Sequence, residues 1–362
     1  MDTPPWSFFL RWKNVSALTL LCLALCFCSC RSHSADTRAP DRAFYYWRSV
    51  FSLTPLEKMS LQTLHVNKLY VKFFDVDWDA ATELAKPIAI LRIRDTSFYH
   101  FKVTPVVFIT NETLLQTDTS YVTRLSANIA DLITQLQQRG HLPPPDEIQL
   151  DCDWTATTKD RYFALIRAVR GWLDTHHQKT CILSATIRLY QCKYREKTGV
   201  PPVARGLLMC YNMGRLKDPN ARNSILDPDE LREYTAHLSS YPLPLDVAFP
   251  TFDWKVLYRD QKYAGLIEDL PASILHSCPA VRIDKDNYYS FLRDTSLEKY
   301  TFQAGDRLRD EQSDYAAVYD AAGLISHQLK NPPSNVILYH LAPTNLSKYS
   351  THELENIFNR FD

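Results

Sequence analysis

The carboxyl end of a predicted strand carries two acids that could do chemistry. The run 147–152 has the apolar character of a buried strand, and Asp151 and Asp153 stand two residues apart at its end. Because side chains alternate along a strand, Asp151, Asp153 and Thr155 are expected to share one face. Active sites of α/β enzymes lie at this end of their strands. Two carboxylates so close cannot both ionise cheaply, so one pKa should rise.

The same residues also fit a structural role. Asp151 could pair with a buried lysine or arginine, and Asp153 or Thr155 could cap the helix that follows. On the next predicted strand, Arg188 could clamp an anionic group or Asp153, or it could form a structural ion pair, and Gln191 lies just beyond it. The sequence alone leaves both roles open.

Acids and tryptophans also follow other predicted strands. Asp75, Asp77 and Trp78 end one of them, and Trp154 and Trp254 lie at or just past the ends of two more. These residues could form a sugar-binding rim, with indole rings for stacking on sugar C–H groups. A solvated acidic loop and buried core tryptophans are the structural alternatives. Calcium is not expected, because no glycine and no closing acid follow at the spacing of a calcium loop.

The composition argues against several classes of function. The 362 residues contain 41 Lys+Arg and 41 Asp+Glu, and without a basic block nucleic acid is not an expected partner. Only 8 glycines are present, and neither common glycine-rich phosphate loop occurs. No histidine or cysteine spacing suits a metal, so no metal or cofactor is expected. Cys152, Cys181 and Cys210 fall inside apolar runs, as buried free thiols do.

The first 30 residues resemble a targeting segment. Arg11 and Lys13 precede an apolar run, 15–26, that is short of the roughly 20 residues that span a bilayer. Ser29-Cys30 then resembles the lipobox of bacterial lipoproteins, with Cys30 acylated; an uncleaved single-span anchor is the alternative. Both predict a protein exported to the bacterial periplasm or outer membrane and held at a membrane. Residues 31–62 are expected to form a polar tether and a short helix.

Strand-like and helical patterns alternate over the rest of the chain. Predicted helices at 121–138 and 159–176 place apolar residues on one face, and several strands are apolar on both faces, as parallel strands covered by helices are. Eight strands alternating with helices predict an α/β fold, a (β/α)8 TIM barrel over 63–362, with a small α+β insertion after the seventh strand at about 252–310. The predicted strands are 64–74, 87–93, 103–110, 147–152, 181–188, 206–211, 244–249 and 335–341.

Three segments, in this order, are similar to one enzyme family. The run Asp-Cys-Asp-Trp-Thr at 151–155 resembles the Asp-x-Asp-Trp-Glu end of the fourth-strand signature of family 18 glycoside hydrolases, the chitinase-like barrels. Residues 207–214 resemble the sixth strand of that family, and residues 242–250 resemble the seventh. The family often carries an α+β insertion after its seventh strand, where this chain has its extra segment.

The resemblance implies roles for three residues and exposes three departures, of which the first is Ile148, where the family has the first aspartate of its long signature. In the family the substrate's own acetamido oxygen attacks, and a glutamate protonates the bridging oxygen. Asp153 would stabilise the acetamido group, with Asp151 behind it and Tyr211 bonding from across the barrel. The glutamate position is Thr155, which cannot protonate a leaving group at pH 7. The acid that follows the sixth-strand tyrosine is Asn212 here.

The leading hypothesis is an exported, membrane-anchored protein with a glycoside-hydrolase-like barrel that binds or processes a glycan or oligosaccharide. Asp151, Asp153 and Tyr211 are the candidate catalytic residues, and chitinase-type activity is expected to be altered or lost. Substrate contacts are expected from Asp75, Asp77, Trp78, Trp154, Thr155, Arg188, Gln191, Asn212 and Trp254. The alternative is a non-enzymatic cell-envelope scaffold lipoprotein that contacts another protein. The oligomeric state is left open.

Overall fold

The computed structural model describes residues 1, 39–176, 180–213, 216–285 and 287–362. The chain divides into two compact units, Met1–Ala39 and Pro40–Asp362, and the second unit contains all the helices and strands described below. The predicted lipobox at Cys30 and residues 31–38 of the predicted tether lie outside the described residues. Within the described part of the chain, no helix is long and apolar enough to cross a membrane.

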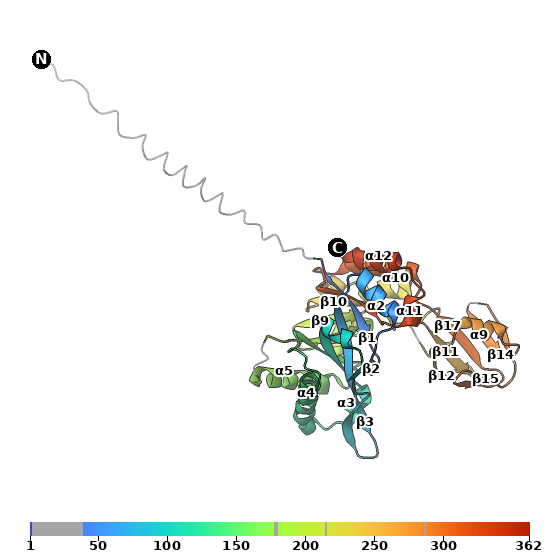
Figure 1. The fold of residues 1–362 in the computed structure, drawn as a ribbon, viewed down its shortest axis with the longest axis horizontal. Coiled ribbons are helices and arrows are strands. Elements are labelled where there is room, and N and C mark those ends of the chain that lie inside the picture. Colours follow the sequence, from blue (N-terminus) through green and yellow to red (C-terminus); the bar gives the residue numbers. More distant parts are fainter. Residues whose placement is uncertain (2–38, 177–179, 214–215, 286) are drawn as a thin grey trace. The chain divides into compact units, whose positions relative to one another are not determined.

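Eight parallel strands close into a barrel, as the sequence predicts (Figure 1). Each strand pairs with the next in chain order, and β1 pairs with both β3 and β18, which closes the ring. β7 and β10 are buried along their whole length, because the barrel interior covers one face and helices cover the other. The barrel strands are β1 (Asp41–Tyr46), β3 (Lys68–Asp79), β6 (Lys102–Ile109), β7 (Glu147–Cys152), β8 (Ile182–Arg188), β9 (Arg205–Met209), β10 (Leu245–Pro250) and β18 (Asn335–Tyr339).

The longer helices carry the apolar face that the sequence predicts. α4 (Val122–Arg139) buries Leu125, Ile129 and Ile133 at helical spacing, and it packs beside α5 (Lys159–Thr175). The other described α-helices are α2 (Pro55–Thr63), α3 (Asn111–Gln116), α6 (Leu189–Lys193), α7 (Arg195–Thr198), α8 (Pro228–Thr235), α9 (Ala272–Ser277), α10 (Tyr315–Gln328), α11 (Pro343–Leu346) and α12 (Thr351–Phe358). Four 3-10 turns complete the helical part of the described chain: η1 (Thr96–His100), η2 (Thr119–Tyr121), η3 (Leu238–Ser240) and η4 (Asn359–Phe361).

The barrel begins earlier in the chain than predicted. The segment 31–62 is expected to be a tether with a short helix, but it contains β1, then β2 (Val50–Phe51), then the short helix α2. The tether prediction is therefore wrong from Asp41 onward. The last four residues of β1 are at most 1% exposed, since the strand lies between β3 and β18. β1 begins with the charged residues Asp41 and Arg42 and follows a polar segment, so its burial is not apparent from the pattern alone.

The predicted second strand at 87–93 is not a barrel strand. β4 (Leu84–Ile88) pairs antiparallel with the outer half of β3 in a hairpin, and β5 (Arg92–Ile93) pairs with β2. β3 has 12 residues, so its end extends past its last pairing with β6, where β4 takes up the free edge. Ile88 and Ile90 are exposed there. This run has the apolar composition of a barrel strand, but no helix covers it, so its apolar residues are not buried.

The insertion after the seventh strand is present, and it has its own sheet, in the order β12-β11-β17-β14-β13. Leu257, Phe302 and Leu308 belong to its separate apolar core. The sheet holds the loop after β9, because Arg309 Nη1 donates a hydrogen bond of 2.7 Å to the carbonyl oxygen of Asp218. Its strands are β11 (Trp254–Arg259), β12 (Lys262–Ile267), β13 (Val281–Ile283), β14 (Tyr288–Phe291) and β17 (Arg307–Glu311), beside a hairpin of β15 (Thr295–Leu297) and β16 (Tyr300–Phe302).

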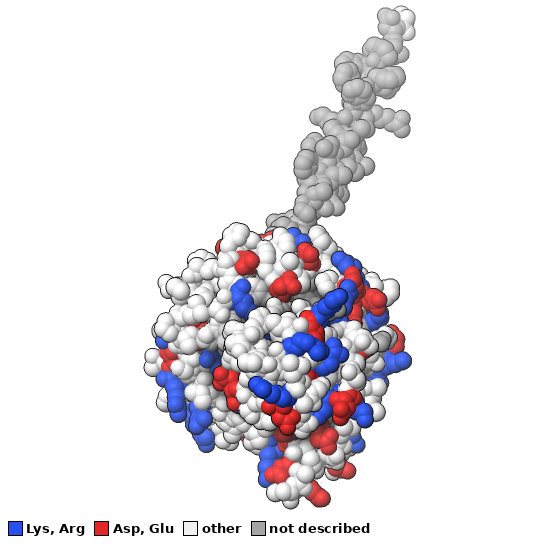
Figure 2. Space-filling model, turned by 90° about the vertical axis from the view of Figure 1, so that its right-hand side faces the viewer, with Lys and Arg blue, Asp and Glu red and all other residues white. Residues whose placement is uncertain are grey.

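Charge is balanced both inside the barrel and on the surface. Lys72 and Asp246 are buried, and each has a partner, as a buried charge requires. Lys72 Nζ lies 3.0 Å from Asp75, and Asp246 lies 2.7 Å from the Asn335 amide and 3.3 Å from Arg205. Burial raises the pKa of Asp246 above its usual value, and the charge of Arg205 offsets part of this rise. On the face shown in Figure 2, side chains of both signs are interspersed among uncharged ones.

Candidate functional site

Asp151 lies at the carboxyl end of β7 and is 7% exposed. Thr186 of the neighbouring β8 donates a hydrogen bond of 2.6 Å to its Oδ1. Burial, followed by the charge of Asp153, raises the pKa of Asp151 to about 7, although the hydrogen bond from Thr186 lowers it. The raised pKa agrees with the expectation for two neighbouring carboxylates. The group therefore holds a proton over part of the neutral pH range.

Replacing Asp151 with asparagine is expected to stabilise the protein at pH 8 and to have little effect at pH 4. The folded-state pKa lies above the value of 3.8 for a solvated Asp, so the free energy of unfolding falls as the pH rises from about 4 to about 7. The Asp151→Asn variant keeps an acceptor for Thr186 and removes the charge. It should therefore gain about 2–4 kcal/mol at pH 8. Urea unfolding at both pH values measures the gain, and an equal gain at pH 4 and pH 8 would contradict the raised pKa.

Asp153 follows β7 and is paired with the arginine that ends β8. Its Oδ1 lies 3.1 Å from Arg188 Nε, and both side chains are more than one-third exposed, at 39% and 37%. Of the roles predicted for Arg188, the structure therefore selects the pairing with Asp153. An ion pair this exposed contributes about 1 kcal/mol at most, so a ligand can replace either partner at small cost.

Thr155 begins the turn into α5 and does not continue the strand. β7 ends at Cys152, and the Thr155 carbonyl oxygen accepts the backbone N–H groups of Thr158 and Lys159. The Thr155 hydroxyl is 2.8 Å from that of Thr157 and 3.3 Å from that of Thr158. The cap predicted at Thr155 is therefore wrong, because Thr158 is the N-cap residue of α5 and the exposed Thr155 side chain contacts neighbouring threonine hydroxyls. Thr155 is also not an acid, so it cannot supply the proton that the resemblance requires.

Aromatic rings cover the barrel interior at the same end. We call Trp47, Phe108, Tyr211, Phe252 and Tyr339 the aromatic floor. Tyr339 is its centre: its ring centroid lies 5.1 Å from Tyr211 in a stacked arrangement, 5.5 Å from Trp47 and 5.6 Å from Phe252. Phe108 joins through Trp47 at 6.2 Å. Trp47, Phe108 and Tyr339 are partly exposed, so they present ring surface of the kind that lines small-molecule sites.

Tyr211 and Asn212 follow β9 at the edge of this floor. Burial raises the pKa of Tyr211, with smaller contributions from neighbouring tyrosines and from Asp151, so its hydroxyl stays neutral. Among the described residues, no hydrogen bond joins Tyr211 to Asp151 or Asp153; the three share one end of the barrel without forming a bonded triad. Asn212 Oδ1 is buried and has no hydrogen-bond partner in the described chain. It is an acceptor that a ligand N–H group could satisfy.

Two acids of β3 lie near the same level of the barrel. Asp75 and Asp151 both align with Phe108 of β6, which lies between their strands. Asp75 is bound to Lys72, and its other oxygen is buried without a partner among the described residues. Asp77 accepts a hydrogen bond of 2.9 Å from a threonine hydroxyl. Within the described ranges, no group of three or more His, Cys, Asp or Glu residues could hold a metal ion.

Three predicted contact residues lie away from the aromatic floor. Trp78 is in the β3–β4 hairpin, beyond the last pairing of β3 with β6. Trp154 is 2% exposed; its Nε1 donates to the Thr198 carbonyl oxygen at 2.9 Å, and its ring stacks on Tyr162 of α5. Gln191 is 1% exposed, and backbone groups occupy both ends of its amide. Trp154 and Gln191 are therefore core residues: Trp154 packs against α5 after β7, and Gln191 lies on α6 after β8.

Trp254 adjoins the aromatic floor from the insertion. Its ring centroid lies 5.2 Å from that of Phe252, and its Nε1 donates a hydrogen bond of 2.6 Å to Glu311. The side chain is partly exposed. Of the predicted tryptophans, Trp254 is the one whose position suits a platform beside the barrel mouth.

The sequence does not predict several residues of the site. Tyr339 and Phe252 lie at or just past the ends of the eighth and seventh barrel strands, so the carboxyl end of each predicted strand is a usable signal for both. Trp47 follows β1, and it is not predicted as a site residue because that segment is predicted to be a tether. Thr186 and Phe108 lie on correctly predicted strands, but only the neighbouring strands reveal that they lie beside Asp151.

No protein-family model matches the chain, and no curated protein matches it. Solved structures share its fold. The spore cortex-lytic enzyme SleL of Bacillus megaterium QM B1551 has a TM-score of 0.54 at 12% identity, over 91% of this chain and 76% of that chain. A chitinase from Chromobacterium violaceum ATCC 12472 has a TM-score of 0.52 at 12% identity, over 88% and 98%. SleL of Bacillus cereus has 0.51 at 14%, over 90% and 75%. At these identities the likeness establishes the barrel fold.

Proposed function

We propose that this chain is an exported, membrane-anchored protein whose barrel binds N-acetylated glycans and has lost chitinase-type cleavage. One observation carries the proposal: the acids Asp151 and Asp153 lie at the carboxyl end of β7, beside the aromatic floor, while the position of the family's glutamate is Thr155, in the turn before α5. A barrel alone does not define an activity, so the proposal depends on these side chains.

Loss of cleavage follows from the absence of a suitable proton donor. Substrate-assisted cleavage of a glycosidic bond requires an acid that protonates the bridging oxygen. The Thr155 hydroxyl is not acidic enough, and Asp153 forms an exposed ion pair with Arg188. Asp151 can hold a proton near pH 7, but it is 7% exposed and bonded to Thr186. The described mouth therefore lacks an exposed acid at the position where the resemblance requires one.

Binding of a glycan is supported by the groups that remain. The aromatic floor provides ring faces for sugar C–H groups, and Asp153 and Arg188 provide hydrogen-bonding groups at its edge. Asn212 Oδ1 is an unsatisfied acceptor, among the described residues, suited to an acetamido N–H. Two of the structural neighbours are named as a chitinase and a spore cortex-lytic enzyme, which supports glycans of this class as ligands.

The membrane anchor rests on the N-terminal sequence. The apolar run 15–26 and the Ser29-Cys30 pair support export and acylation of Cys30. Intact-mass measurement of the protein extracted from membranes tests this part, because a mature chain without a diacylglycerol group would contradict it.

Replacing Tyr339 with leucine is expected to weaken binding of an N-acetylglucosamine oligosaccharide about tenfold, since the central ring of the floor is lost. Leucine keeps apolar bulk in the packed floor. Titration calorimetry measures the affinity, and thermal unfolding verifies the fold. The matched control is Tyr190→Leu, which removes a tyrosine that is 52% exposed on α6. Equal affinity of the Tyr339→Leu variant and the unaltered chain would contradict binding at the floor.

A second candidate function is residual hydrolysis with Asp151 as the acid. The observation that favours it is the pKa of about 7, which suits a general acid at neutral pH. This function requires Asp151 to reach the bridging oxygen past Asp153. A cleavage rate that falls as the pH rises through about 7, and that Asp151→Asn abolishes, would establish it in place of the binding function.

A further inference from the structure

A cavity of about 460 Å³ lies at the opposite end of the barrel from Asp151. Its size is within the roughly 300–1,000 Å³ of small-molecule pockets. The proposed glycan site uses residues at the carboxyl ends of the strands, so this cavity is separate from it. Its lining includes the first residue of every barrel strand except β10: Asp41, Lys68, Lys102, Glu147, Ile182, Arg205 and Asn335.

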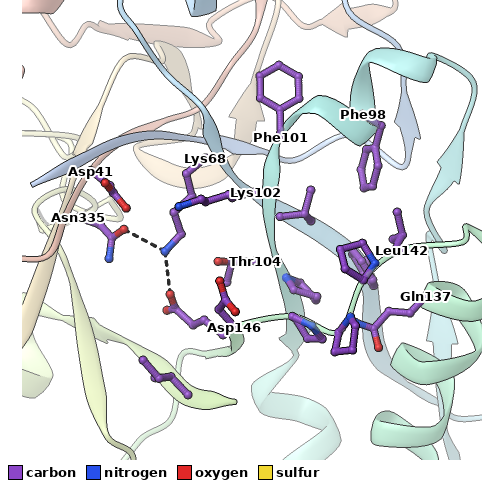
Figure 3. Close-up of a pocket in the computed structure, with 18 of the residues that line it drawn as sticks. Asp41, Lys68, Phe98, Phe101, Lys102, Thr104, Gln137, Leu142, Asp146 and Asn335 are labelled. Carbon is purple, nitrogen blue, oxygen red and sulfur yellow. Dashed lines mark hydrogen bonds and ion pairs between the residues drawn. The ribbon is translucent and has the colours of Figure 1, made fainter. Parts of the chain in front are cut away.

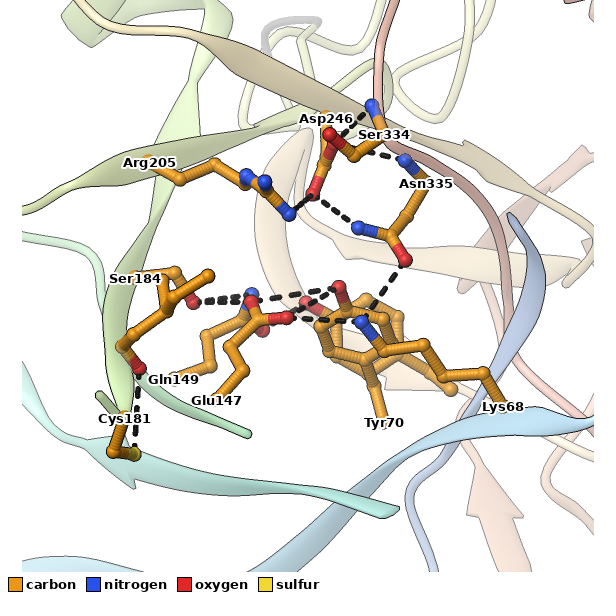
Figure 4. Close-up of polar contacts among 12 residues, drawn as sticks. Lys68, Tyr70, Glu147, Gln149, Cys181, Ser184, Arg205, Asp246, Ser334 and Asn335 are labelled. Atoms are coloured by element: carbon orange, nitrogen blue, oxygen red, sulfur yellow. Dashed lines mark hydrogen bonds and ion pairs between the residues drawn. The ribbon is translucent and has the colours of Figure 1, made fainter. Parts of the chain in front are cut away.

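Buried acids near this cavity are already neutralised by the protein. Glu147 accepts hydrogen bonds from Lys68 at 2.9 Å, Ser184 at 2.7 Å and Tyr70 at 3.2 Å (Figure 4). Asp246 is likewise bonded to Arg205 and Asn335. These groups form a rigid, satisfied network at the end of the barrel interior, and they leave little charge for a ligand.

Two charged side chains of the cavity are not neutralised in this way. Lys102 and Asp146 both line it and are both exposed. Among the described residues, neither side chain has a hydrogen bond or an ion pair, and they do not pair with each other. Lys102 is also the register partner of Lys68 on the neighbouring strand, so two like charges lie side by side. An anionic group near Lys102 would relieve that repulsion, and a cationic group would satisfy Asp146.

One side of the cavity is apolar. Phe98 and Leu142 lie on its right side in Figure 3, opposite Lys68 and Lys102, and Phe101 lies near its top. Pro143 adds a further rigid apolar surface. A ligand that uses the whole cavity therefore needs an apolar body as well as charged groups.

We propose that this cavity binds a free α-amino acid with an apolar or aromatic side chain. The carboxylate pairs with Lys102, the ammonium group pairs with Asp146, and the side chain contacts Phe101 and Leu142. A zwitterion fits because the cavity offers, among the described residues, one unpaired charge of each sign. The site is independent of the glycan site and of its activity.

Three probes and two variants of the full chain test this assignment by calorimetry at millimolar concentration. L-phenylalanine carries both charges, 3-phenylpropionate lacks the ammonium group, and phenethylamine lacks the carboxylate. Phenylalanine is expected to bind tightest. Lys102→Met should lower the affinity for phenylalanine and for phenylpropionate about threefold to fivefold, as expected for the loss of a partly exposed ion pair. The affinity for phenethylamine should not change. Asp146→Asn should lower the affinity for phenylalanine and for phenethylamine by a similar factor, and the affinity for phenylpropionate should not change.

Both substitutions replace exposed side chains, so the fold is expected to persist, and thermal unfolding of each variant verifies it. Lack of phenylalanine binding would overturn the proposal. Binding that neither variant weakens would overturn it as well, because the ligand would then lie elsewhere. A saturating N-acetylated oligosaccharide should leave phenylalanine binding unchanged; competition between the two would contradict a separate site.

Discussion

Replacing Thr155 with glutamate is expected to raise cleavage of an N-acetylglucosamine oligosaccharide about 100-fold or more over the unaltered chain. The physical reason is that a positioned general acid typically contributes about 10²–10⁴ to the rate. Thr155 is exposed in the turn that follows β7, so the longer side chain has room. Product release followed by mass spectrometry measures the effect.

The matched control for this gain is Thr155→Gln, which has the same shape and no acidic proton. Arg188→Gln in the Thr155→Glu background tests a second effect, because Arg188 pairs with Asp153 at 3.1 Å and so competes with the acetamido group for it. We expect the Thr155→Glu, Arg188→Gln double variant to be the fastest of the set. If neither glutamate variant exceeds the Thr155→Gln control, the missing acid is not what prevents cleavage.

Replacing Lys68 with methionine is expected to lower the free energy of unfolding by about 3–5 kcal/mol. Lys68 Nζ lies 2.9 Å from Glu147, and the two side chains are 12% and 4% exposed. Without the lysine, the Glu147 carboxylate would remain buried with only the hydroxyl donors of Tyr70 and Ser184. Urea unfolding at pH 7 measures the loss.

The double variant Lys68→Met, Glu147→Gln shows whether buried charge is the cause. A neutral amide still accepts the two hydroxyl hydrogen bonds, so the double variant should regain at least half of the lost stability. Ordinary loss of side-chain packing would not be recovered by the second substitution. A double variant as unstable as Lys68→Met alone would therefore contradict the electrostatic explanation.

Strands that are long or strongly apolar can be predicted well from the sequence. The run 147–152 coincides with β7, the run 335–341 contains β18, and the helix predicted at 121–138 is α4 within one residue. Each has a pattern that extends over enough residues to exclude alternatives. The predictions for β1 and the β3–β4 hairpin are wrong because their roles depend on which strands lie beside them, and pairing is a tertiary property.

The candidate site is predictable only where the strand pattern continues. Asp151 lies on β7 and Tyr211 follows β9, so both are at the carboxyl end, where the pattern places them. Alternation fails after Cys152, where the chain turns towards α5: Trp154 enters the core and Thr155 joins the start of the helix. Tyr339 belongs to the site because its ring contacts Trp47 and Tyr211, which follow other strands. Contacts between separate strands cannot be predicted from the sequence of one segment.

The proposed function requires that the barrel binds a glycan and does not cleave it. The most direct test mixes residues 39–362, which contain the compact unit, with a saturating N-acetylglucosamine oligosaccharide. Calorimetry then measures binding, and mass spectrometry of the same sample measures products. We expect saturable binding and an intact oligosaccharide after prolonged incubation. Cleaved product would contradict the loss of activity, and absence of binding would contradict the glycan proposal itself.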